Sequence, residues 1–186
     1  RGVEMAFRWL ILLAICVGLT GCATNAVTGR SQYVIVSEQS AIAQSAQAYS
    51  AMVSQLDKSG KLKNDPALQE RVDEITGRLV AQAIRYRPET RDWAWSVKII
   101  DDPETVNAFC MAGGKMAIYT GLIEKIQPTD DELAQVMGHE IGHAIANHSA
   151  EKMSVAMTAQ LGVAIFAALG STSRNRDLRY GGGAIA

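Results

Sequence analysis

Apolar residues recur at helical spacing in two stretches of the N-terminal half. In residues 41–56 they fall three or four positions apart, and a second stripe of this kind runs through residues 68–83. The second stripe follows Asp65 and Pro66, which are typical of a helix cap and a first helical residue. We therefore predict two helices, the second ending before Pro88, with both apolar stripes in the core.

Alternating apolar residues then predict a small sheet. Residues 93–100 alternate as a strand does, and residues 115–120 form a second short apolar run closed by Gly121. A turn at residues 101–103 and a loop over residues 107–114 separate them, with Gly113 and Gly114 as a tight turn into the second strand. The elements together predict an α+β domain that is mostly helical and carries a small β-sheet.

The first 21 residues have the pattern of a secretory signal. Arg8 is followed by an apolar run at residues 9–17, which is shorter than the roughly 20 residues of a membrane span, and Met5 is the expected start of translation. Residues 19–22, Leu-Thr-Gly-Cys, resemble the bacterial lipobox, which implies cleavage before Cys22 and lipid on its thiol. An ordinary signal with a chance cysteine is the alternative. Ala23 stands where an aspartate would signal inner-membrane retention, so we expect the outer membrane.

Charge and cysteine content narrow the function further. The net charge is −1, from 18 basic and 19 acidic residues, which argues against a nucleic-acid binder. Of three cysteines, Cys16 would leave with the signal and Cys22 would be acylated, so the mature chain has no internal disulfide. The remaining Cys110 we expect to be a small buried hydrophobe and not a reactive thiol. We divide the chain into a signal (residues 1–21), a tether (22–37) and a catalytic domain (38–186).

The candidate chemistry lies on a predicted helix that begins after residue 129. Thr129 and Glu132 have the spacing of a capping box, and the helix carries His-Glu-Ile-Gly-His at residues 139–143. Four residues turn a helix by about 400°, so His139 and His143 lie one above the other and can reach one metal ion. Glu140 is turned about 100° from His139 and can reach a water molecule without ligating the metal. We predict one zinc ion per chain bound by His139 and His143, with Glu140 as the catalytic base.

Other residues near this motif are poorer ligand candidates. If the helix continues, His148 is turned about 140° from His143 and cannot share its metal, so we interpret it as a surface or structural residue. Glu151 lies roughly 12 Å beyond His143 along the same helix, too far to join it. Residues 155–169 are almost wholly apolar, and we expect a buried or partly exposed core helix there and not a lipid contact.

Two segments resemble the HtpX-like zinc metallopeptidases, which include the CAAX prenyl proteases. The segment HEIGHAIANHSAEKM at residues 139–153 is similar to the family's motif helix, and residues 107–122 are similar to its strand segment. With the lipobox, the chain looks most like the LoiP-type lipoprotein branch. The resemblance implies a zincin-like fold. It also implies that the strand after Gly114 is a sheet edge, where Met116, Ala117 and Ile118 bind extended substrate by β-augmentation.

The sequence departs from the family at the third zinc ligand. The family takes this ligand from a glutamate in a Glu-x-x-x-Asp motif on a later helix, but no glutamate follows Glu151 here. The one later acid, Asp177, has no such motif around it. We expect the third ligand beyond residue 186, so that the domain is incomplete at its C-terminus. The 186 residues alone should then bind zinc weakly and lack peptidase activity.

The resemblance and the motif predict a zinc-dependent endopeptidase. It would be lipid-anchored on the periplasmic side of the bacterial outer membrane. Its substrates would be misfolded or membrane-associated proteins, in protein quality control. The alternative is a non-catalytic lipoprotein that binds unfolded or membrane proteins through an edge strand. Neither hypothesis involves nucleic acid.

Overall fold

A computed structural model of the chain describes residues 5, 9, 22–25 and 27–180, with side chains for all of these except 22, 23 and 165–180. The predicted secretory signal lies outside the described residues, apart from Met5 and Trp9, and so do the three lipobox residues that precede Cys22.

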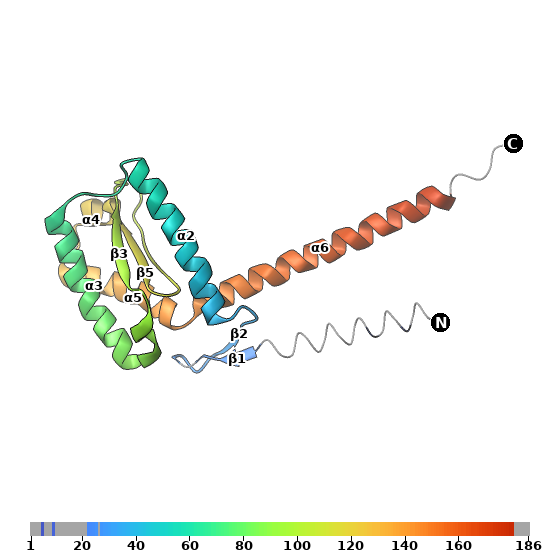
Figure 1. The fold of residues 1–186 in the computed structure, drawn as a ribbon, viewed down its shortest axis with the longest axis horizontal. Coiled ribbons are helices and arrows are strands. Elements are labelled where there is room, and N and C mark those ends of the chain that lie inside the picture. Colours follow the sequence, from blue (N-terminus) through green and yellow to red (C-terminus); the bar gives the residue numbers. More distant parts are fainter. Residues whose placement is uncertain (1–4, 6–8, 10–21, 26, 181–186) are drawn as a thin grey trace.

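A three-stranded sheet stands at the centre of the domain (Figure 1). Its strand order is β3 (Ser96–Ile100), β5 (Lys115–Tyr119) and β4 (Ala108–Met111), with β3 parallel and β4 antiparallel to β5. Helix α2 (Glu38–Lys58) covers one face, and α3 (Pro66–Tyr86) and α5 (Asp130–Ile145) pack against the other. Short helices η1 (Pro88–Asp92) and α4 (Thr120–Ile126) connect these elements. The predicted mostly helical α+β class is confirmed.

The predicted long helices form where their caps stand. The Asp65 side chain accepts a hydrogen bond from the Leu68 amide at the start of α3, and Thr129 and Glu132 form a complete capping box at the start of α5. The apolar stripes of these helices pack with one face of the sheet into a single core. Its fully buried members include Val72, Ile118, Leu133 and Met137.

The region between the two predicted strands is more ordered than expected. Residues 108–111, which we predicted as loop, form β4, and the chain then reverses at Gly113 and Gly114. Both glycines have positive φ angles, of 81° and 77°, and a Cβ on Gly114 would lie 2.4 Å from the Trp95 ring. This turn is tight enough to lay β4 directly beside β5.

The predicted tether is part of the fold. Strands β1 (Cys22–Thr24) and β2 (Ser31–Tyr33) form an antiparallel hairpin that lies against the start of the last helix. Its polar residues Asn25 and Gln32 are only 6% and 3% exposed, and both donate hydrogen bonds to the Ala146 carbonyl at the end of α5.

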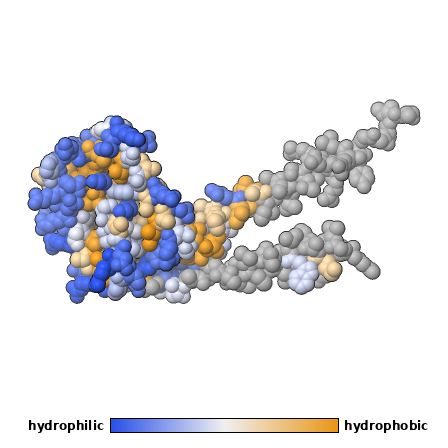
Figure 2. Space-filling view, in the orientation of Figure 1, coloured by the Kyte–Doolittle hydropathy of each residue, from blue (hydrophilic) through white to orange (hydrophobic). Residues whose placement is uncertain are grey.

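The last helix, α6 (His148–Tyr180), packs only through its first turns and then leaves the body of the domain (Figure 1). Ala150 and Ser154 are fully buried, whereas Val155, Leu161 and Val163 are 54%, 54% and 70% exposed. The expected helix over residues 155–169 is present and its described side chains are exposed, but among the residues described beyond Ser154 none lies in the core, so only the core placement is wrong. Figure 2 shows hydrophobic surface where the described part of α6 leaves the domain. Among the described helices, none combines the length and hydropathy that crossing a membrane requires.

Candidate metal and catalytic site

Helix α5 holds the candidate site and is fixed along its buried side. Leu133, Met137 and Ile141 are at most 3% exposed and pack into the core formed with α3 and the sheet. Because these residues recur at helical spacing, they fix the rotation of α5 about its axis. That rotation leaves His139 and His143 together on the exposed side.

The two histidines face each other through the same ring nitrogen. Their Nε2 atoms are 3.0 Å apart, and the ring centroids are 4.4 Å apart with planes inclined at 75°. Two nitrogen ligands of a tetrahedral zinc ion, each about 2.0–2.1 Å from the metal, lie roughly 3.3 Å apart. The pair therefore fits one zinc ion with little rearrangement, and its donor chemistry is the one that zinc prefers.

Glu140 lies on the flank of α5 that turns toward the sheet. Its side chain is half-buried, and its negative charge contributes to raising the pKa of Cys110 on β4. The larger cause is burial, and together they raise the pKa of this thiol to about 12. Cys110 is thus a buried, protonated cysteine, as the sequence predicted, and β4 runs close to the candidate base.

His148 lies beside His143, although the two are on different helices. Helix α5 ends at Ile145, and Asn147 takes a left-handed conformation, with a φ of 57°, before α6 begins. The Nδ1 atoms of His143 and His148 are 2.7 Å apart. Burial, followed by the charge of His143, lowers the pKa of His148. His148 was expected to be turned away from His143 because we predicted a continuous helix, whereas the helix ends at Ile145.

The C-terminal end of α5 is held by side chains from distant parts of the sequence. Asn25 and Gln32 both donate to the Ala146 carbonyl, and Arg87 donates to the Ile145 carbonyl at 2.9 Å. Carbonyls in the last turn of a helix have no hydrogen-bond donor within the helix, and these side chains supply the missing donors. These three side-chain contacts were not predicted from the sequence. An asparagine and a glutamine in a polar segment carry no local signal of a partner more than 100 residues away.

The remaining acidic candidates are not grouped with the histidine pair as metal ligands among the described residues. Glu151 accepts hydrogen bonds from Arg30 at 2.5 Å and from Gln32 at 3.1 Å, and the bond from Arg30 is the main cause of its lowered pKa. Asp177 lies on α6, roughly 40 Å further along the helix than His148. Within the part of the chain that the structure describes, no group of three His, Cys, Asp or Glu residues is placed to hold a metal.

The expected substrate-binding strand is not an edge. Strand β5 is the middle strand of the sheet, because β3 pairs along one side and β4, folded back by the two glycines, pairs along the other. Its residues Met116, Ala117 and Ile118 are 2%, 0% and 0% exposed. They cannot pair with an extended substrate, and this part of the prediction is wrong.

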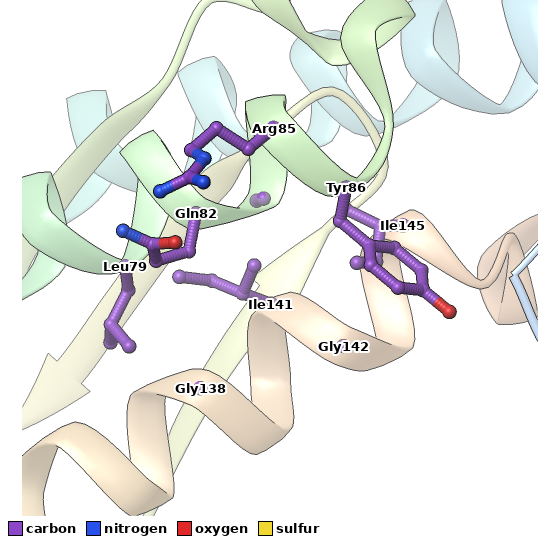
Figure 3. A pocket seen from close by; sticks show the side chains of 9 residues that line it. Leu79, Gln82, Arg85, Tyr86, Gly138, Ile141, Gly142 and Ile145 are labelled. Carbon is purple, nitrogen blue, oxygen red and sulfur yellow. The ribbon is translucent and has the colours of Figure 1, made fainter.

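A groove of about 510 Å³ runs between α3 and α5 (Figure 3). From α5 it is lined by Gly138, Ile141, Gly142 and Ile145, and from α3 by residues that include Leu79 and Tyr86. Its glycine positions each precede a histidine by one residue, which corresponds to about 100° around the helix. The groove therefore flanks the face of α5 that carries the two histidines and does not contain it.

A mostly helical α+β domain with two histidines and a glutamate at this spacing on one capped helix has the features of a metallopeptidase domain. The sequence model of Peptidase family M48 matches residues 66–185, which is more than half of the chain, and the chain belongs to this family.

Several curated proteins are similar to this chain. It is 29% identical over 145 residues to the mitochondrial metalloendopeptidase OMA1 of Bos taurus, covering 77% of this chain and 27% of that protein. It is 38% identical over 90 residues to a putative beta-barrel assembly-enhancing protease of Vibrio cholerae, covering 48% of this chain and 17% of that protein. It is 44% identical over 52 residues to the metalloprotease LoiP of Escherichia coli, covering 28% of this chain and 20% of that protein. The chain thus spans less than a third of the length of these relatives.

Proposed function

We propose that this chain is the catalytic part of a zinc-dependent endopeptidase. The observation that carries the proposal is the 3.0 Å separation of the His139 and His143 Nε2 atoms, with Glu140 on the turn between them. The M48 family membership and the metalloendopeptidase names of its relatives support it.

The chain's own residues have separate roles in this proposal. His139 and His143 would hold the zinc ion, which when bound polarises a carbonyl and lowers the pKa of water toward about 7. Glu140 takes a proton from the attacking water and delivers it to the leaving amine. A catalytic zinc ion normally has three protein ligands, and we expect the third outside the described residues.

Strand β4 is a better candidate than β5 for contact with substrate. It is the outer strand of the three-stranded sheet, it packs against α5, and its Cys110 senses the charge of Glu140. An extended peptide added to its free side would lie next to the catalytic helix and gain backbone hydrogen bonds with little sequence preference. The same free edge would serve the alternative of a purely binding lipoprotein, so the sheet does not separate the two hypotheses, and the paired histidines with Glu140 are what favour the enzyme.

The proposed cellular setting rests on two bacterial relatives and on the N-terminal sequence. Similarity to LoiP and to a putative beta-barrel assembly-enhancing protease, both bacterial, supports an envelope-associated protein. The lipobox-like residues before Cys22 support a lipid anchor on the periplasmic side of the outer membrane. Misfolded or membrane-associated proteins are the proposed substrates, and the LoiP-type branch is the proposed subgroup.

The substitution Glu140→Gln tests the catalytic assignment in the full-length gene product. It keeps the shape of the side chain and both histidines but removes the base. Zinc affinity should remain close to that of the wild type, while the rate of casein cleavage should fall by a factor on the order of hundreds or more. Zinc affinity is measured by competition with a chelator, and cleavage by release of labelled peptides.

Asp131→Asn is the matched control, because it removes a carboxylate from the exposed first turn of the same helix. Its cleavage rate should equal that of the wild type. If Glu140→Gln cleaves casein as fast as Asp131→Asn, Glu140 is not the base.

A further inference from the structure

We propose that His148 is a positioning residue for the metal ligand His143. In this role it accepts a hydrogen bond from His143 Nδ1 and thereby directs His143 Nε2 toward the ion. The inference rests on the proposed zinc site and adds a residue to it.

The contact between His143 and His148 involves the ring nitrogen of His143 that would not bind the metal. His143 Nε2 faces His139 Nε2 at 3.0 Å, so the opposite nitrogen, Nδ1, is free for a second partner. That partner is His148 Nδ1, at 2.7 Å, with the two ring centroids 4.9 Å apart. Metal-binding histidines usually donate their second N–H to a fixed acceptor, which sets the tautomer and the ring orientation.

The assignment of protons follows from that geometry. When His143 offers the lone pair of Nε2 to a metal, its proton is on Nδ1 and is donated to His148. His148 Nδ1 must then be the acceptor, and its own proton lies on Nε2. The same geometry excludes His148 as a ligand of the shared ion, because it contacts the side of the His143 ring that faces away from His139.

The break between the helices makes this contact available. In a continuous helix, five residues would turn His148 about 140° away from His143. The left-handed Asn147 ends that continuity, and the Asn147 amide donates to the Ala144 carbonyl at 3.0 Å. The Asn25 and Gln32 side chains fix the Ala146 carbonyl just before the break, so the start of α6 is held beside the end of α5.

Three substitutions at one position separate positioning from folding. His148→Asn places an amide where Nδ1 was, with an oxygen that can accept from His143. His148→Gln carries the same amide one carbon further out, and His148→Ala has no acceptor. The full-length gene product of each is titrated with Zn²⁺ against a competing chelator, and the melting temperature of the metal-free protein is measured. Lys152→Ala, an exposed position on the same helix, and His143→Ala serve as controls.

We expect His148→Ala and His148→Gln to bind zinc about 10- to 100-fold more weakly than the wild type. His148→Asn should stay within a few-fold of it, Lys152→Ala should match it, and the metal-free melting temperatures should be similar throughout. Wild-type affinity in His148→Ala, with loss in His143→Ala, overturns this inference alone. If His148→Ala loses melting temperature and affinity together and His148→Asn restores neither, the role is structural and the inference is also overturned. If the wild type binds no zinc, or His143→Ala binds it equally well, the proposed function falls as well.

Discussion

Cys110 shows how the surroundings of one side chain set its chemistry. A thiol next to a candidate active site is a reasonable target for metal binding or oxidation. Here it points into the core from β4, and burial together with the Glu140 charge raises its pKa to about 12. Since the thiolate is the reactive form, this residue is a packing residue at physiological pH.

We therefore expect Cys110 to resist alkylation in the folded protein. At pH 8 iodoacetamide should modify it only at the rate of unfolding, and the rate should not rise between pH 7 and pH 9 as it does for an ordinary thiol of pKa about 8.5. Mass spectrometry of the peptide that contains Cys110 measures this, with protein unfolded in urea as the control. Rapid modification of the native protein would contradict the burial described here.

At the scale of elements, helix α5, which carries the candidate site, is capped by two different mechanisms. Its start depends on Thr129 and Glu132, three residues apart, whereas its end depends on Asn25, Gln32 and Arg87 from other parts of the chain. The first mechanism is local and the second is tertiary. Both fix the helix on which the two histidines must stay aligned.

The capping box makes the stability of α5 dependent on pH. Hydrogen bonds from Thr129, first from its amide and then from its hydroxyl, hold the pKa of Glu132 below its usual value of 4.5. A lowered folded-state pKa means that the stabilisation is complete above the unfolded value and is lost as pH falls through the folded one. The melting temperature of Glu132→Gln should therefore lie below that of the wild type at pH 7, and the difference should shrink below about pH 4.5. A difference that stays constant down to pH 3 would show that ionised Glu132 contributes nothing.

The same contrast explains what the sequence could predict. Helices α2, α3 and α5 were predicted because caps and apolar stripes are local patterns. The pairing of His139 with His143 was predicted because helix geometry alone brings them together. Strand β4 was missed because four residues ending at two glycines resemble a loop. His148 was misplaced because one left-handed asparagine, with no glycine or proline beside it, ended the helix.

At the scale of the whole molecule, the N-terminal hairpin ties the domain together. Its residues bind the end of α5 through the Ala146 carbonyl and the start of α6 through Glu151. Gln32 contributes to both contacts and is almost fully buried. The hairpin is therefore a structural part of the metallopeptidase domain, and the boundary that we drew at residue 38 divides a single unit.

Gln32→Ala should lower the free energy of unfolding by about 1–3 kcal/mol, because it removes a donor to the Ala146 carbonyl and leaves Asn25 without one of its partners. Urea denaturation followed by circular dichroism measures the loss. Gln47→Ala, at an exposed position of α2, is the control and should change stability little. Equal stability of the two variants would mean that the hairpin does not brace the domain.

Cys22→Ser should release the full-length protein from membranes if Cys22 carries lipid as proposed. Cys16→Ser, inside the expected signal, should leave the protein attached. Fractionation of cells and mass spectrometry of the mature N-terminus distinguish the two variants. An unmodified N-terminus in the membrane-free wild type would contradict the anchor.

If Cys22 carries lipid as proposed, the hairpin fixes how far the domain can move from the membrane surface. Three residue steps separate Cys22 from the buried Asn25, and an extended chain covers about 10 Å in three steps. A surface attached at Cys22 therefore stays within about that distance of the end of α5. The domain cannot move far from the surface, as it could on a long flexible linker. Substrates would have to come to this enzyme at the surface itself. The greatest distance from the surface at which Glu140 could act is then set by the size of the folded domain. Lengthening the chain between residues 22 and 25 would increase that distance, so that proteins further from the surface could be cut.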